Sequence, residues 1–158
     1  MPDTFAQAMN AACKMLAYRD RSVHEIRKKL AQKRFGNDDL ISRVVERLIA
    51  NGLLDDEKFA RIYSESLARN KKVGPRYIKH ALAKKGLGGE LVQRTVEDLF
   101  ADPDAEGKEI ENLMEKKLMT FKKNLTPTGR KKRVYNFLVG RGFTHPAIMQ
   151  AINRWDFL

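Results

Sequence analysis

Cysteine and long apolar runs are almost absent from this sequence. Its 158 residues include a single cysteine, Cys13, so no intrachain disulfide can form. No apolar stretch approaches the roughly 20 residues that a membrane-spanning helix needs. The first residues also lack the basic-then-apolar pattern of a signal peptide. We therefore expect a cytoplasmic protein with no disulfide and no contact with a membrane.

Motifs typical of enzymes and metal sites are missing as well. There is no phosphate-binding loop and no Gly-x-Ser-x-Gly turn. His24, His80 and His145 are far apart, and with one cysteine they give no metal-ligand spacing. The stretch 102–107 opens like a calcium loop, but Leu113 stands where the twelfth-position carboxylate is required. The sequence thus predicts no enzyme, no cofactor and no metal.

Three neighbouring carboxylates, Asp55, Asp56 and Glu57, form the most concentrated acidic group. A catalytic role would require a pocket and a partner acid or base. The structural interpretation is simpler, because Asp55 is placed to cap a helix whose first turn holds Asp56 and Glu57 beside the positive end of the helix dipole. We favour the structural interpretation.

Positive charge, by contrast, is abundant and concentrated. Lysine and arginine number 31 against 20 acids, which gives a formal net charge of +11. The windows 21–35, 71–86 and 127–142 together hold 17 of these bases and a single acid, Glu25. Such a distribution favours a polyanionic partner, either nucleic acid or an acidic protein surface. A basic face that is merely solvated remains the alternative.

The basic windows coincide with a repeat. Shifts of 52 and then 56 residues align apolar positions in three copies, among them Ile26, Ile78 and Val134, and Leu30, Leu82 and Leu138. Within each copy the pattern predicts three helices, and no alternating strand pattern occurs. The middle helices are expected to begin after a Ser22–Glu25 capping box, at Gly74–Pro75 and at Thr126–Pro127.

The predicted fold is therefore all-α, with three tandem three-helix modules at 1–54, 55–101 and 102–158. The first helices of the modules are expected at about 5–19, 56–70 and 104–124. Trp155 near the end of the third module either fills its core or anchors an interface, since tryptophan serves both purposes.

Several of these motifs resemble those of the RecX family, bacterial regulators of the RecA recombinase. AYRDRSVHEIRKKL at 17–30 resembles the family's first repeat, and GLLDDEKFA at 52–60 resembles its junction motif. GPRYIKHALAKKG at 74–86 is similar to the second repeat, and RVYNFLVGRGF at 133–143 is similar to the third.

The resemblance implies an elongated, curved array of the three modules. It also implies a monomer that binds the RecA–DNA filament and suppresses its ATPase, strand exchange and co-protease activities, within DNA repair, homologous recombination and the SOS response. Weak binding to single- or double-stranded DNA without sequence specificity is implied too.

From charge and position, we expect the partner to contact bases on the middle helices and next to them. They are Arg27, Lys28, Arg69, Lys71, Lys72, Arg76, Lys79, Lys84, Lys85, Arg130, Lys131, Lys132 and Arg133.

Two other functions remain open. One is a DNA-binding protein of helix-turn-helix-like modules, without sequence specificity because the basic helices carry few Asn or Gln residues. The other is an adaptor that grips a different acidic protein.

Overall fold

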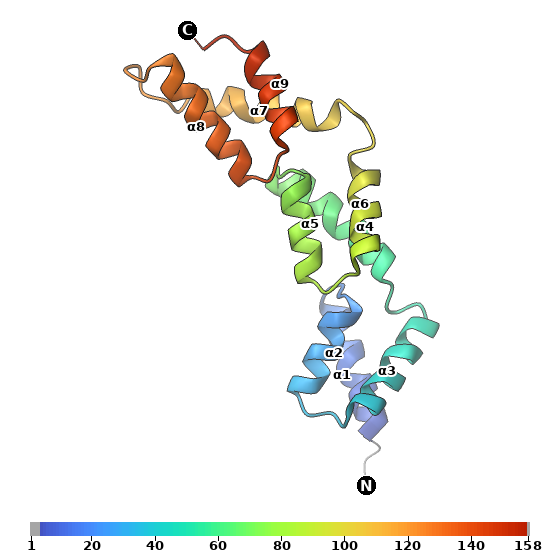
Figure 1. Ribbon diagram of the computed structural model, residues 1–158. Helices are drawn as coiled ribbons and strands as arrows, with labels where there is room; N and C mark the ends of the chain where they lie inside the picture. The colour runs from blue at the N-terminus through green and yellow to red at the C-terminus, as the bar shows by residue number, and fades with distance from the viewer. Residues whose placement is uncertain (1–3, 158) are drawn as a thin grey trace. The chain divides into compact units, whose positions relative to one another are not determined.

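Helices make up the whole regular structure of the described part of the chain. The computed structural model describes residues 4–157; residues 1–3, at the start where no signal peptide is predicted, and residue 158 lie outside it (Figure 1). Residues 4–157 contain no strand, which confirms the all-α prediction. In order, the elements are α1 (Thr4–Tyr18), α2 (Val23–Gln32), α3 (Asp38–Ala50), α4 (Asp56–Ser66), the π-helical turn η1 (Leu67–Lys71), α5 (Pro75–Lys84), α6 (Gly89–Leu99), α7 (Ala105–Leu118), α8 (Pro127–Gly140) and α9 (His145–Arg154).

The chain divides into two compact units. The first consists of Met1–Tyr63 with Leu82–Val92, and the second of Ser64–Ala81 with Gln93–Leu158. Helices α4, α5 and α6 therefore each contribute residues to both units. The module boundaries at 54/55 and 101/102 remain a prediction from the repeat.

In the first unit, α1, α2 and α3 enclose a core. Ile26 and Leu30, one turn apart on α2, are fully buried between Ala12 of α1 and Val44 of α3. The alanine lets α1 approach closely, because it adds no side chain beyond a methyl group. Burying each large aliphatic side chain contributes roughly 1.5–3 kcal/mol, so this core holds the three helices together.

In the second unit, α7, α8 and α9 form a second core. Val134 and Leu138 of α8 repeat the spacing of the α2 pair and are fully buried against Met114 of α7 and Ile148 of α9. Trp155 is half-buried and packs against the same core, which supports its interpretation as a core residue.

Two helices differ from the expected ranges. The helix expected at 104–124 ends at Leu118, because the Thr120 hydroxyl and backbone N–H both donate to the Lys117 carbonyl, at 2.6 and 3.0 Å, and tighten the chain into a turn. The helix expected at 56–70 is α-helical only to Ser66 and continues as η1. Lys72 then adopts a left-handed conformation, with φ of 55°, that ends it.

The middle helices begin where the sequence signals predict. Ser22, Gly74 and Thr126 directly precede α2, α5 and α8. Helix α8 has 14 residues, whereas α2 and α5 have 10 each. The four extra residues form one additional turn at its start, and they explain why the repeat shift rises from 52 to 56.

Candidate polyanion interface

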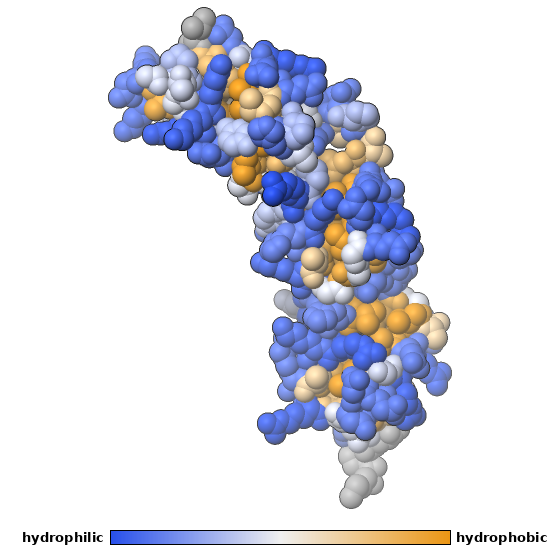
Figure 2. Space-filling model, in the orientation of Figure 1, coloured by the Kyte–Doolittle hydropathy of each residue, from blue (hydrophilic) through white to orange (hydrophobic). Residues whose placement is uncertain are grey.

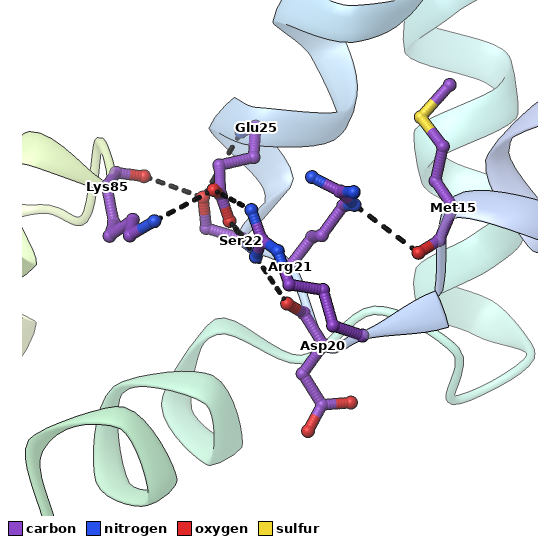
Figure 3. A network of polar contacts seen from close by, with 7 residues as sticks. Met15, Asp20, Arg21, Ser22, Glu25 and Lys85 are labelled. Atoms are coloured by element: carbon purple, nitrogen blue, oxygen red, sulfur yellow. Dashed lines mark hydrogen bonds and ion pairs between the residues drawn. The ribbon is translucent and has the colours of Figure 1, made fainter. Parts of the chain in front are cut away.

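The start of α2 is held by a network that includes the end of α5. Ser22 is fully buried, and its hydroxyl donates to the Lys85 carbonyl at 2.6 Å (Figure 3). The Ser22 hydroxyl oxygen also accepts from the Glu25 N–H at 3.2 Å, while the Glu25 carboxylate accepts from the Ser22 N–H at 3.1 Å. The predicted capping box is therefore confirmed. The separate hydrogen bond from Ser22 to Lys85 joins residues 63 positions apart in sequence.

Glu25, the only acid of the three basic windows, neutralises two of the cations. Its carboxylate lies 3.0 Å from Lys85 Nζ and 2.8 Å from an Arg19 guanidinium nitrogen (Figure 3 shows the pairing with Lys85). Burial by itself raises the pKa of Glu25. Hydrogen bonds from Arg19, Lys85 and the Ser22 N–H outweigh that effect and lower the pKa from 4.5 to about 2. Lys85 Nζ also lies 5.3 Å from the centre of the Tyr63 ring. The Lys85 charge therefore stabilises the folded protein through contacts with both Glu25 and Tyr63.

We predict that Glu25→Gln lowers the free energy of unfolding by about 2 kcal/mol at pH 7, since charge-assisted hydrogen bonds are lost. A folded-state pKa below the unfolded value gives stability that is present above pH 4.5 and is lost as the pH falls towards 2. Urea unfolding at pH 7, 4 and 3 should therefore show the two proteins converging at low pH. The exposed Glu46→Gln is the control, with little change expected. An equal deficit for Glu25→Gln at all three pH values would contradict the pairing.

The second unit contains a similar set of hydrogen bonds. We call each such connection, between the start of one middle helix and the end of the next, a joint. The N–H of Gly74, which precedes α5, donates to the Arg141 carbonyl at 2.8 Å, and the Arg76 N–H donates to the Gly142 carbonyl at 2.9 Å. In the repeat register Gly74 corresponds to Ser22, and Arg141 corresponds to Lys85. The start of a middle helix thus receives the end of the following middle helix in both units.

Each joint is closed by a glycine with positive φ. Gly86 has φ of 75° and Gly142 has φ of 83°. A Cβ at Gly86 would lie 2.2 Å from the His24 side chain, and one at Gly142 would lie 2.3 Å from the Tyr77 backbone nitrogen. Because real Cβ atoms do not approach so closely, these glycines serve both as helix caps and as points of close contact with the first turn of the preceding middle helix.

Within residues 4–157, three of the expected contact residues take part in ion pairs. Besides Lys85, these are Arg27, 3.5 Å from Asp38, and Lys72, 3.7 Å from Glu109. The Arg27 and Lys72 side chains keep 38% and 46% of their surface exposed, against 26% for Lys85. Weak, exposed pairs of this kind can be exchanged for contacts with a partner at little cost. Lys85 has the shortest ion pair and the least exposed side chain of the three.

On α5 the remaining cations share one side of the helix. At 100° per residue, Arg76, Lys79 and Lys84 fall within an arc of about 140°. The buried Ile78 and Leu82 lie on the opposite side. Arg76 and Lys84 are exposed and Lys79 is half-buried, so α5 presents a cationic stripe to solvent, and hydrophilic residues cover this helix in Figure 2.

On α8 the four consecutive bases cannot share one face, because steps of 100° spread them around the helix. Arg130 is half-buried, and its Nε is buried. Lys131 Nζ lies 5.5 Å from the centre of the Phe157 ring. Lys132 and Arg133 are exposed. The outward charge of α8 therefore comes mainly from Lys131, Lys132 and Arg133.

The other expected contacts are exposed. Lys28 lies on α2, and Arg69 and Lys71 lie on η1. Lys71 Nζ is 3.3 Å from the Tyr77 hydroxyl. Arg141 was not among the expected contacts, yet its guanidinium donates to the Lys71 carbonyl and, at 3.2 Å, to the Lys72 carbonyl. Arg141 aligns with Lys85 in the repeat. That alignment could have indicated a structural role for this position at the joint.

The acidic group at the start of α4 has the structural role that we favoured. The Asp55 carboxylate accepts from the Lys58 N–H at 3.1 Å, and Asp56 accepts from the Val23 N–H at 2.9 Å. Among residues 4–157, His, Cys, Asp and Glu form no group of three or more that is arranged to hold a metal ion. The described helices also include none that is long and apolar enough to cross a membrane.

These features define an all-helical protein of three-helix domains whose middle helices are basic. Family models for the first and second three-helix domains of RecX match residues 8–48 and 55–96. The chain belongs to the RecX family.

Relatives and solved structures agree with this assignment. The chain is 34% identical to the regulatory protein RecX of Mycolicibacterium smegmatis over 87% of this chain and 73% of the relative. It is 32% identical to that of Prosthecochloris aestuarii, with 93% and 92% covered. It spans only about half (53%) of the RecX protein of Lactococcus lactis. The crystal structure of RecX from Lactobacillus salivarius has the same fold, with a TM-score of 0.85 at 23% identity and full coverage of both chains.

Proposed function

We propose that this protein is a non-enzymatic regulator that binds the RecA–DNA filament and inhibits its ATPase, strand exchange and co-protease activities. Such a regulator acts in the cytoplasm, in homologous recombination, DNA repair and the SOS response. Family membership supports the class of partner. The observation that carries the proposal is the concentration of unneutralised positive charge on the middle helices.

A filament repeats its acidic protein surface and its phosphates at regular intervals. The modules at 1–54, 55–101 and 102–158 each present one basic middle helix, so a single molecule touches several filament subunits. Linked contacts strengthen one another, because the second binding event takes place at a high effective concentration. Weak individual contacts are then sufficient for tight binding by a monomer.

Within the proposed contact set, burial and pairing rank the residues. Exposed cations without an acidic partner lose the least on transfer to a phosphate or an acidic surface. They form the principal contacts, with the paired Arg27, Lys72 and Lys85 as secondary ones. The principal set is Lys28, Arg69, Lys71, Arg76, Lys84, Lys131, Lys132 and Arg133. The half-buried Lys79 and Arg130 are further secondary contacts.

The test is the ATPase activity of RecA on single-stranded DNA, titrated with this protein. We expect hydrolysis to fall at amounts well below one protein per RecA subunit, since each molecule bridges neighbours. A gel shift with unrelated duplexes in the absence of RecA serves as the comparison and should show only weak binding without sequence preference. Unchanged hydrolysis at low salt would refute the proposal. Tight binding to all of the unrelated duplexes would favour a stand-alone DNA-binding protein without sequence specificity instead.

A further inference from the structure

The segment from η1 to the first turn of α5 is strongly basic and has an unusual backbone. Residues 67–76 contain Arg69, Lys71, Lys72 and Arg76 and no acid. The π-helical conformation of η1 is rare and occurs frequently at functional sites. Lys72 follows it with φ of 55°, in the left-handed region that residues other than glycine seldom adopt. A backbone of this kind persists only where surrounding contacts hold it.

Arg141 supplies such contacts. Its guanidinium donates to the Lys71 carbonyl and, at 3.2 Å, to the Lys72 carbonyl. Both carbonyls lie at the end of η1, where helical carbonyls lack partners within the helix. The guanidinium carbon also lies 5.1 Å from the centre of the Phe137 ring, which favours this orientation. Within residues 4–157 Arg141 forms no ion pair, so its role is to hold backbone and not to neutralise an acid.

The conformation of η1 decides where its cationic side chains lie. Lys71 Nζ is 3.3 Å from the Tyr77 hydroxyl, and Lys72 Nζ is 3.7 Å from a Glu109 carboxylate oxygen. Arg69 is exposed. Like charges so close in sequence repel one another, so an unsupported segment would spread over many conformations. A partner would then have to order the segment on binding, which weakens affinity.

We infer that Arg141 is a positioning residue, which holds η1 by the Lys71 and Lys72 carbonyls in the conformation that binds the anionic partner. The inference rests on the proposed binding to the filament. It gives Arg141 no contact with the partner, because the residue acts through the three bases of η1 and its end. Since Arg141 directly follows α8, binding by these bases depends on the end of α8 as well.

The first test is a double-mutant cycle on binding to preassembled RecA–DNA filaments. Arg141→Lys keeps the charge but loses the planar fork that reaches two carbonyls. Binding should weaken about fivefold, since the partner then has to order η1. In a protein that already carries Arg69→Ala, Lys71→Ala and Lys72→Ala, the same change should weaken binding less than about twofold. An equal loss in both backgrounds would mean that Arg141 contacts the filament itself or supports the whole fold, and would overturn the inference. So would unchanged binding by Arg141→Lys alone.

Hydrogen exchange followed by mass spectrometry gives a second measurement that needs no RecA. The amides of residues 67–73 should exchange about tenfold faster in Arg141→Lys, because local opening becomes more favourable, whereas those of α2 should not change. Arg47→Lys, at an exposed position on α3, is the matched control and should alter neither exchange nor binding. Normal binding by the unmodified protein, with unchanged exchange in Arg141→Lys, would overturn this inference alone. No binding by the unmodified protein would refute the proposed function and this inference with it.

Discussion

Gly142→Ala is expected to lower the free energy of unfolding by about 3 kcal/mol. Alanine at a φ of 83° is strained by about 1 kcal/mol or more. Its Cβ would also lie 2.3 Å from the Tyr77 nitrogen, so the backbone segments must separate. The hydrogen bonds from Gly74 and Arg76 to the end of α8 are then weakened. Chemical unfolding followed by circular dichroism at 222 nm measures the change.

Alanine substitutions at two further glycines distinguish the effect of backbone strain from the effect of close contact. Gly52 has φ of 69° but open space around it, so Gly52→Ala should cost only the strain, about 1 kcal/mol. Gly140, in the last turn of α8, has open space and no positive φ, and alanine there should be neutral or stabilising by up to about 1 kcal/mol. A cost for Gly142→Ala no greater than that for Gly52→Ala would contradict the close contact between Gly142 and Tyr77.

Removal of the α5 stripe is expected to have the largest effect on function. The variant Arg76→Ala, Lys79→Ala, Lys84→Ala should require about tenfold more protein for half-inhibition of RecA ATPase, since three phosphate or carboxylate contacts are lost. Helix content should not change, because the three side chains lie opposite the buried Ile78 and Leu82. Lys85 is left intact, since its pairing with Glu25 supports the fold.

The matched control removes the same charge from outside the basic windows. Arg47, Lys108 and Lys116 are all exposed, and their replacement by alanine lowers the net charge equally. This variant should shift half-inhibition less than twofold. Equal losses in the two variants would mean that total charge, rather than its placement on α5, governs inhibition.

Local sequence signals predicted most of the fold. The apolar register is confirmed at its centre, since Ile26, Ile78 and Val134 are all fully buried. The Ser22–Glu25 capping box is confirmed as well. These features depend on spacings of three or four residues, which helical geometry fixes without reference to the rest of the chain.

The joints could not be predicted in the same way. Glu25 and Lys85 are 60 residues apart, and nothing in either segment specifies that they meet. The early end of α7 likewise depends on the turn at Lys117 to Phe121, which lacks a glycine or proline stop signal. Tertiary contacts bring Glu25 and Lys85 together, whereas the local hydrogen bonds from Thr120 to the Lys117 carbonyl end α7.

The most direct measurement is the salt dependence of binding to preassembled RecA–DNA filaments, for the unmodified protein, the α5 variant and an α8 variant lacking Lys131, Lys132 and Arg133. If several middle helices bind together, the logarithm of affinity falls steeply with the logarithm of salt concentration. Each triple variant then reduces that slope by about 2, and the combined variant by about 4. A slope near zero, or one that neither variant changes, would contradict binding through the cations of the middle helices.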